Sequence, residues 1–176
     1  LDITTKGDAA ALAAVLGGDL LPTGSVRVRN AAQVSSLPGY DAGDWWVQDA
    51  AAALPARLLN AQKGEKILDL CAAPGGKTMQ LAAAGADVTA LDVSENRVKR
   101  LSENLARVGI QAQVVVADAM EYDQDGWDAI LLDAPCSATG TIRRHPDLPW
   151  AKDGSEFGAL IDQQADMIDH ALSLLK

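Results

Sequence analysis

From residue 63 onward, short runs of apolar residues alternate with amphipathic segments, and this alternation sets the strongest limit on the fold. The apolar runs lie at residues 67–70, 88–91, 114–116 and 128–132. Runs that are apolar at nearly every position are typical of strands buried on both faces of a sheet, and the amphipathic segments fit helices that cover those faces. The sequence therefore predicts an α/β fold with a parallel sheet and right-handed crossovers.

The residues before this alternation follow a different pattern. Asp8 is placed as the N-cap of a helix at residues 9–16, and residues 25–29 alternate between polar and apolar, as a half-buried strand does. We therefore expect a small α+β subdomain at residues 1–36 and a core domain at residues 37–176.

Four further segments are expected to be helices, and they span residues 50–59, 77–84, 95–108 and 156–175. Pro55 would kink or restart the first of them. The basic residues of the third helix are expected to form a solvated face, and they are Arg97, Lys99, Arg100 and Arg107. The apolar residues of the last helix are expected to face the core. They are Phe157, Leu160, Ile161, Ile168, Leu172 and Leu175.

The composition excludes several classes of protein. An apolar fraction of 48% with 22% charged residues is ordinary globular usage, so global disorder is excluded. No stretch reaches the roughly 20 apolar residues of a membrane-spanning helix, and no signal-peptide pattern opens the chain. The two cysteines are expected to be reduced thiols in a cytoplasmic protein. The chain begins with Leu1, which suggests processing or a fragment.

Each predicted strand of the sheet ends in a polar feature. The first strand runs into the sequence CAAPGGKT at residues 71–78, and the other three end at Asp92, Asp118 and Asp133. Ligands of open α/β sheets bind beyond the carboxyl ends of the strands. The sequence therefore predicts a ligand site at this edge.

The glycine-containing loop narrows the choice of ligand. A phosphate-binding P-loop needs a glycine five residues before Gly76, where this chain has Cys71, and the G-x-G-x-x-G fingerprint is absent. Asp92 follows the loop by about 20 residues, where an acid accepts hydrogen bonds from ribose hydroxyls. Asp118 is available for the exocyclic amine of adenine. An adenosine ligand without pyrophosphate, S-adenosylmethionine, fits this pattern better than NAD.

The two cysteines differ in their expected roles. Cys136 follows Pro135 in the loop after the last predicted strand, at the ligand edge, so a chemical role is favoured over inert packing. Cys71 lies at the exit of a buried strand, where packing or a backbone contact with the ligand is expected.

Two motifs in combination resemble those of the Sun/Fmu-type RNA (cytosine-5)-methyltransferases of the RsmB/NOP2 superfamily, the bacterial 16S rRNA type in particular. They are CAAPGGKT at residues 71–78 and DAPCSATG at residues 133–140. The sequences IRRHPD at 142–147 and VQD at 47–49 are similar to that family as well. The resemblance covers residues 37–176 and, more weakly, the N-terminal subdomain.

This resemblance implies a Rossmann-like class I methyltransferase fold, S-adenosylmethionine as the cofactor and ribosomal RNA as the substrate. The implied cofactor contacts are Cys71, Ala72, Ala73, Pro74, Gly75, Gly76, Lys77, Asp92, Asp118 and Asp133. The implied catalytic residues are Cys136, Asp133 and Lys77, with Asp133 holding the edge of the base and Lys77 balancing local charge. A thiolate must add to C6 of cytosine before C5 can attack the methyl group.

The chain departs from the family pattern in one respect. The family nucleophile lies in a later Thr-Cys motif, and the Pro-Cys thiol, here Cys136, assists product release. The sequence contains no Thr-Cys pair, so we expect the main nucleophile to lie C-terminal to this chain. The family sheet would then be truncated before its fifth strand and keep the order 3-2-1-4. Residues 129–132 would form an exposed edge strand that favours self-association.

A local basic segment is the candidate RNA contact. The net charge of −9 argues against adsorption of the whole surface to nucleic acid, although it permits a local patch. That patch is expected at Arg143, Arg144 and His145, with Lys152 and Trp150 nearby. For Trp45 and Trp46, subdomain packing is favoured over base stacking, and no metal is expected.

Two alternatives remain open from the sequence. The chain could be a methyltransferase for another substrate, or a module that binds S-adenosylmethionine or RNA without activity.

Overall fold

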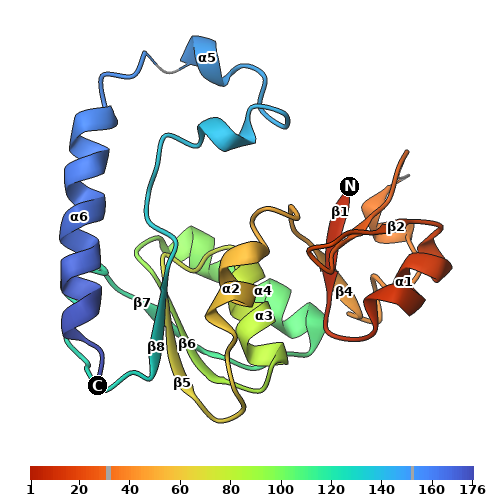
Figure 1. Ribbon diagram of the computed structural model, residues 1–176, viewed down its shortest axis with the longest axis horizontal. Coiled ribbons are helices and arrows are strands. Elements are labelled where there is room, and N and C mark those ends of the chain that lie inside the picture. The colour runs from red at the N-terminus through yellow and green to blue at the C-terminus, as the bar shows by residue number, and fades with distance from the viewer. Residues whose placement is uncertain (31–32, 152) are drawn as a thin grey trace.

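The computed structural model describes residues 1–30, 33–151 and 153–176. Figure 1 shows a small antiparallel sheet beside a larger sheet that is covered by helices. The larger sheet and its helices carry the sequence features predicted for the ligand site.

The small sheet has four strands in the order β2-β3-β1-β4. They are β1 (Asp2–Thr5), β2 (Asp19–Leu20), β3 (Val26–Arg27) and β4 (Trp45–Val47), and all neighbours are antiparallel. Helix α1 (Ala9–Leu16) packs on one face, over a cluster that contains Ile3, Val26 and Trp45.

The predicted cap of α1 is confirmed. Asp8 Oδ1 accepts hydrogen bonds from the amides of Ala10 (2.8 Å) and Ala11 (3.2 Å), which satisfies donors that the first helical turn leaves free. The division into residues 1–36 and 37–176 stays a prediction. The structure adds that β4, from the second range, pairs with β1 of the first.

The larger sheet is parallel, as predicted. Its strands are β5 (Lys66–Leu70), β6 (Asp87–Asp92), β7 (Gln113–Val116) and β8 (Ala129–Leu132), and their order is β7-β6-β5-β8. In chain order these are strands 3-2-1-4, so the predicted Rossmann-like arrangement is confirmed. Strand β8 is an edge strand of this sheet within the described part of the chain.

Helices cover both faces of the parallel sheet. They are α2 (Leu54–Leu59), α3 (Gly76–Ala83), α4 (Glu95–Val108) and α6 (Phe157–Ser173), and α5 (Leu148–Ala151) lies in the segment before α6. Short 3-10 turns lie at η1 (Val34–Ser36) and η2 (Thr139–Thr141). Residues of α2, α3 and α4 pack on one face, and residues of α6 pack on the other. Pro55 lies in the first turn of α2, so it begins this helix and does not kink it.

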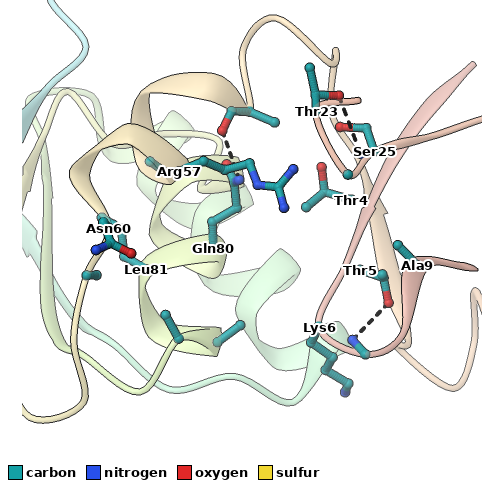
Figure 2. A pocket seen from close by; sticks show the side chains of 17 residues that line it. Thr4, Thr5, Lys6, Ala9, Thr23, Ser25, Arg57, Asn60, Gln80 and Leu81 are labelled. Carbon is teal, nitrogen blue, oxygen red and sulfur yellow. Dashed lines mark hydrogen bonds between the residues drawn. The ribbon is translucent and has the colours of Figure 1, made fainter. Parts of the chain in front are cut away.

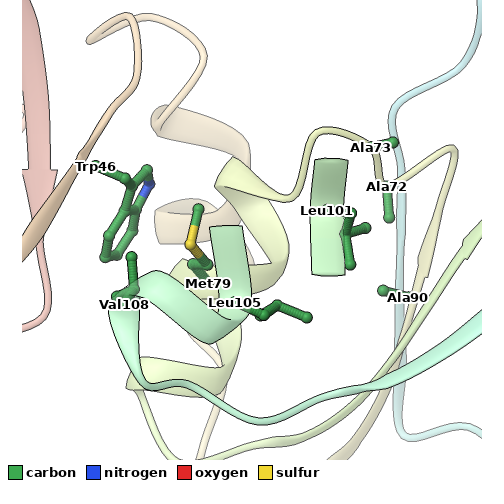
Figure 3. Packing of buried hydrophobic residues seen from close by; sticks show 8 residues of the cluster. All are labelled: Trp46, Ala72, Ala73, Met79, Ala90, Leu101, Leu105 and Val108. Carbon is green, nitrogen blue, oxygen red and sulfur yellow. The ribbon is translucent and has the colours of Figure 1, made fainter. Parts of the chain in front are cut away.

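Figure 3 shows the apolar cluster between the sheet and the helices on one face. Met79 of α3 and Leu101 and Leu105 of α4 lie over Ala90 of β6, and Trp46 closes the cluster on the side of the small sheet. Trp45 and Trp46 are almost fully buried, so their predicted packing role is confirmed.

The predicted inward face of α6 is wrong at most of its positions, although Leu160 and Leu175 are half-buried. The buried residues of this region are Met167, Ala171 and Leu174, whereas the exposed fractions of Ile161, Ile168 and Leu172 are 64%, 52% and 60%, and Phe157 is exposed too. The apolar residues of this helix lie on more than one side, so helical spacing alone permits two inward faces. In the described part of the chain, no helix is long and apolar enough to span a membrane.

Candidate functional site

The carboxyl edge of the parallel sheet brings the predicted site residues together. The loop at 71–77 leaves β5, Asp92 is the last residue of β6, and Asp118 and Asp133 follow β7 and β8. The register aligns the last residues of β5 with those of β6 and β8, and it places Asp92 opposite Val116. The three carboxylates and the loop therefore lie along one edge.

Asp92 anchors the loop. Its side chain is 1% exposed, and its carboxylate accepts hydrogen bonds from the amides of Ala73 and Ser94, both at 3.1 Å. Arg97 forms an ion pair with Asp92 at 3.1 Å and also donates to the carbonyl of Ala73. Arg97 is exposed, as predicted for a solvated face, and the structure adds that its side chain reaches back over the N-terminus of α4 to the loop.

The two glycines of the loop allow close packing against neighbouring side chains. Gly75 has φ +99°, and a Cβ there would lie 3.1 Å from Leu101 Cγ. A Cβ on Gly76 would lie 3.2 Å from Gln48 Nε2. Asn104 also donates a hydrogen bond of 2.9 Å to the carbonyl of Pro74. Both glycines therefore lie against side chains of this protein, and α4 contacts the loop at residues 73–75.

Lys77 and Asp133 form an ion pair of 2.6 Å at this edge. Asp69 of β5 lies nearby and is fully buried. It accepts a hydrogen bond of 2.6 Å from Thr78 Oγ1, while its Oδ1 has no hydrogen-bond partner among the described residues. Burial raises the pKa of Asp69 to about 7, and the Thr78 hydrogen bond and Lys77 oppose this rise.

Sequence reasoning missed Asp69, although a signal was present. This residue is the only acid in the otherwise apolar run at 67–70, and carboxylates are almost never fully buried unless they are paired.

A cavity of about 340 Å³ lies between the loop and residues 47–52, which belong to the segment that links the two sheets. Asp69, Lys77 and Asp133 line one side of it, and Asp49 and Arg144 line another. Asp92, Asp118 and Cys136 are not among its lining residues. Within the described ranges, no group of three or more His, Cys, Asp or Glu side chains could hold a metal ion.

The two cysteines have different environments. Cys136 is exposed, and its sulfur accepts a hydrogen bond of 3.4 Å from the amide of Ala138. The preceding residue, Pro135, is held by Gln164 of α6, which donates to its carbonyl at 2.7 Å. Cys71 is half-buried, and burial, reinforced by Asp92, raises its pKa to about 11. Cys71 is therefore a neutral thiol near pH 7, whereas Cys136 is accessible.

The predicted basic segment lies on the strand-to-helix connection after Cys136. Arg143, Arg144 and His145 are exposed. Arg143 pairs with Asp49 at 3.0 Å, so the connection is tied to the linker between the sheets. Trp150 is 91% exposed. Lys152, which was predicted to belong to this patch, lies outside the described residues.

Arg107 differs from its predicted role on a solvated face. It donates to the carbonyls of Tyr40 (2.9 Å) and Trp45 (3.1 Å), and its guanidinium lies 4.3 Å from the centre of the Tyr40 ring. Arg107 therefore joins α4 to the small subdomain. Lys99 and Arg100 of the same helix are exposed, as predicted.

Two curated relatives align with most of this chain. Ribosomal RNA small subunit methyltransferase B of Vibrio vulnificus (strain YJ016) is 44% identical over 158 residues, and that of Salmonella arizonae is 47% identical over 158 residues. Each alignment covers 86% of this chain and 37% of the relative, so the chain spans well under half the length of these relatives.

Solved structures support the same fold. The crystal structure of PH0851 is 27% identical with a TM-score of 0.91, and the similarity covers 100% of this chain and 44% of that one. NSun6 from Pyrococcus horikoshii, solved with SFG, is 31% identical with a TM-score of 0.73 and covers 83% of this chain and 39% of that one.

A family model described as 16S rRNA methyltransferase RsmB/F matches residues 56–176, which include the loop, the three strand-end carboxylates and Cys136. Together with the parallel sheet and its carboxyl edge, this match shows that the chain belongs to the RsmB/F family of 16S rRNA methyltransferases.

Proposed function

We propose that this chain binds S-adenosylmethionine and forms part of a cytoplasmic enzyme that methylates C5 of a cytosine in ribosomal RNA. The observation that carries the proposal is the convergence of the loop at 71–77, Asp92 and Asp118 on one edge of the sheet, with the accessible thiol of Cys136 in the neighbouring loop. The curated relatives, named as ribosomal RNA methyltransferases, support the choice of substrate.

The residues at this edge fit an adenosine ligand. A carboxylate has about four acceptor positions, so Asp92 can accept from ribose hydroxyls in addition to its bonds with the loop, if Arg97 gives up part of its contact. Asp118 is exposed beside it, and among the described residues its side chain accepts a hydrogen bond only from the amide of Met120. It is placed to accept from the adenine amine.

The loop backbone at 71–77 would hold the methionyl part of the cofactor. The buried, unpartnered Oδ1 of Asp69 supports a polar ligand group close to Lys77 and the loop. When bound, the cofactor supplies an electrophilic methyl group on a sulfonium.

The chemistry needs a thiolate because C5 of cytosine is a weak nucleophile. Addition of a thiolate to C6 moves the electron pair of the C5–C6 bond to C5, which then attacks the methyl carbon as its bond to sulfur breaks. A base removes the C5 proton, the double bond re-forms and the thiolate leaves. Cys136 would assist this release, with the attacking thiol in the Thr-Cys motif that is expected C-terminal to this chain. Asp133 would hold the base, and Lys77 would balance the charge of Asp133.

The basic segment would hold the RNA beside the site. Arg144 lines the cavity that Asp69, Lys77 and Asp133 also line, and Arg143 and His145 are its exposed neighbours. A cytosine must leave its stack to reach such a cavity, and cations next to it would hold the flanking phosphates.

Calorimetric titration with S-adenosylmethionine tests the cofactor proposal. We expect binding by this chain and at least a tenfold weaker affinity for Asp92→Asn. Asp87→Asn is the matched control, because Asp87 is exposed at the opposite end of the same strand. An affinity that is equal in both variants and the parent would contradict the assigned role of Asp92.

Transfer of a labelled methyl group to 16S rRNA tests the reaction. The positive control is the Vibrio vulnificus relative, and the reaction is run with this chain alone and with a version extended beyond Lys176. Labelled 5-methylcytosine with the extended version supports the proposal. Cofactor binding without transfer by any version would instead support a module that binds S-adenosylmethionine without activity.

A further inference from the structure

A second cavity, of about 510 Å³, lies between the small sheet and the helices α2 and α3 (Figure 2). It is separate from the cavity beside the loop. Gln80 lines the second cavity and Gln48 lines the first, and a hydrogen bond of 2.7 Å between their side chains lies in the wall between them. The proposed methyl transfer uses no residue of this second cavity.

The floor of this cavity is made of polar groups that the sheet geometry turns inward. Successive residues of a strand point to opposite faces. Ile3 and Val26 enter the cluster under α1, so Thr4 and Ser25 face α2 instead. Both are buried, with exposed fractions of 9% and 1%. Neither Thr4 Oγ1 nor Ser25 Oγ has a hydrogen-bond partner in the part of the chain that the structure describes.

The rim of the cavity carries positive charge. Figure 2 shows the guanidinium of Arg57 reaching from α2 across the opening toward Thr4 and Ser25. Its terminal nitrogens lie against Gly24, where φ is +72° and a Cβ would collide with the guanidinium. Arg57 makes no hydrogen bond or ion pair through its side chain with another described residue. Glycine at position 24 therefore leaves room for a guanidinium that has no partner among the described residues.

Among the described residues, the lining contains no carboxylate to neutralise this charge. Lys6 and Arg57 are its two charged residues among the described ones, although the chain as a whole has a net charge of −9. A guanidinium with hydroxyl donors beneath it matches the oxygens of a phosphate group, which accept several hydrogen bonds at once. A cavity of 510 Å³ also has room for a sugar attached to that phosphate.

We propose that this cavity is a phosphate-binding site, with Arg57 as the charged ligand and the hydroxyls of Thr4 and Ser25 as donors on its floor. The phosphate belongs either to the backbone of an RNA or to a free nucleotide. Arg57 would recognise the phosphate group in the same way in both cases. The experiment therefore uses probes that distinguish an RNA from a free nucleotide.

The test is a binding titration followed by NMR amide shifts of the labelled chain, with three probes. They are inorganic phosphate, uridine 5′-monophosphate and a five-nucleotide RNA. We expect at least one probe to shift amides around Thr4, Ser25 and Arg57. We also expect its affinity to fall at least tenfold in Arg57→Gln and at least threefold in Thr4→Val. Arg100→Gln, which removes an exposed arginine of α4, should bind the probe as the parent does.

The pattern among the probes identifies the source. Binding of the RNA alone indicates a backbone phosphate, and binding of the mononucleotide or of phosphate indicates a free ligand. Thr4→Val keeps the shape of the side chain and removes only an unpartnered hydroxyl, so this variant should fold, as circular dichroism would verify. The proposal is overturned if no probe shifts these amides, or if Arg57→Gln and Arg100→Gln bind equally well. Titration of Arg57→Gln with S-adenosylmethionine distinguishes failure of this proposal from failure of the proposed function. This variant should bind the cofactor with the affinity of the parent.

Discussion

Replacement of Asp69 by asparagine should change the way in which stability depends on pH. Asp69 is fully buried in β5, and burial raises its pKa from 3.8 to about 7. Asparagine has nearly the same shape and keeps an oxygen that accepts from Thr78 Oγ1. Asp69→Asn therefore removes the titration with little change in packing.

The direction in which stability changes with pH follows from the pKa of Asp69 in the folded protein and in the unfolded chain. Between pH 3.8 and about 7, the folded protein keeps a proton on Asp69 that the unfolded chain has released. The free energy of unfolding therefore falls as the pH rises through this window, and the loss is complete above the folded pKa. A rise in pKa from 3.8 to about 7 corresponds to a total loss of about 4 kcal/mol. More than half of this loss falls between pH 5 and pH 8.

Urea unfolding of the parent and of Asp69→Asn at several values between pH 5 and pH 8 measures this effect. All other titrating groups are shared, so the stability of the variant relative to the parent should increase by about 3 kcal/mol across the range. Asp87→Asn, at an exposed position, controls for the loss of one negative charge. A difference between Asp69→Asn and the parent that stays constant with pH would refute the reasoning.

Three further predictions concern the surface around the site. Arg143→Ala combined with Arg144→Ala should weaken RNA binding and reduce the slope of its salt dependence by about two, because two phosphate contacts are lost; a fluorescence titration at several salt concentrations would reveal an unchanged slope if the segment does not touch RNA. At pH 7.5, a thiol reagent should modify Cys136 at least tenfold faster than Cys71, whose burial raises its pKa to about 11; equal rates by mass spectrometry would contradict this. The edge of β8 and the exposed apolar side of α6 should cause association at high concentration, which Ile168→Glu should reduce; light scattering that finds only monomer for the parent would refute it.

The sheet could be predicted because its signal is local. Four apolar runs with short helical segments between them leave few alternatives to a parallel sheet, and the acids at the strand ends follow directly from that arrangement. The positions of Asp92, Asp118 and Asp133 along one edge were therefore accessible from the sequence.

The contacts that were missed are non-local. Arg97 and Arg107 lie on a helix face that looks solvated in sequence, but their partners include carbonyls of Ala73 and Tyr40, and no pattern of side chains marks a backbone carbonyl. The inward face of α6 was wrong because this helix has apolar residues on several sides, and the sheet beneath it determines which of them are buried.

The joint between the small sheet and α4 determines where this polypeptide can be shortened. Lys6 donates to the carbonyl of Val108 at 2.5 Å, where a cation offsets the negative end of the helix dipole, and Arg107 reaches back to carbonyls of Tyr40 and Trp45. The same helix supports the loop through Leu101 and Asn104. Deletion of the first strands would remove the contact of Lys6 with the last turn of α4. The N-terminal residues therefore support the helix that contacts the loop at the carboxyl edge of the parallel sheet.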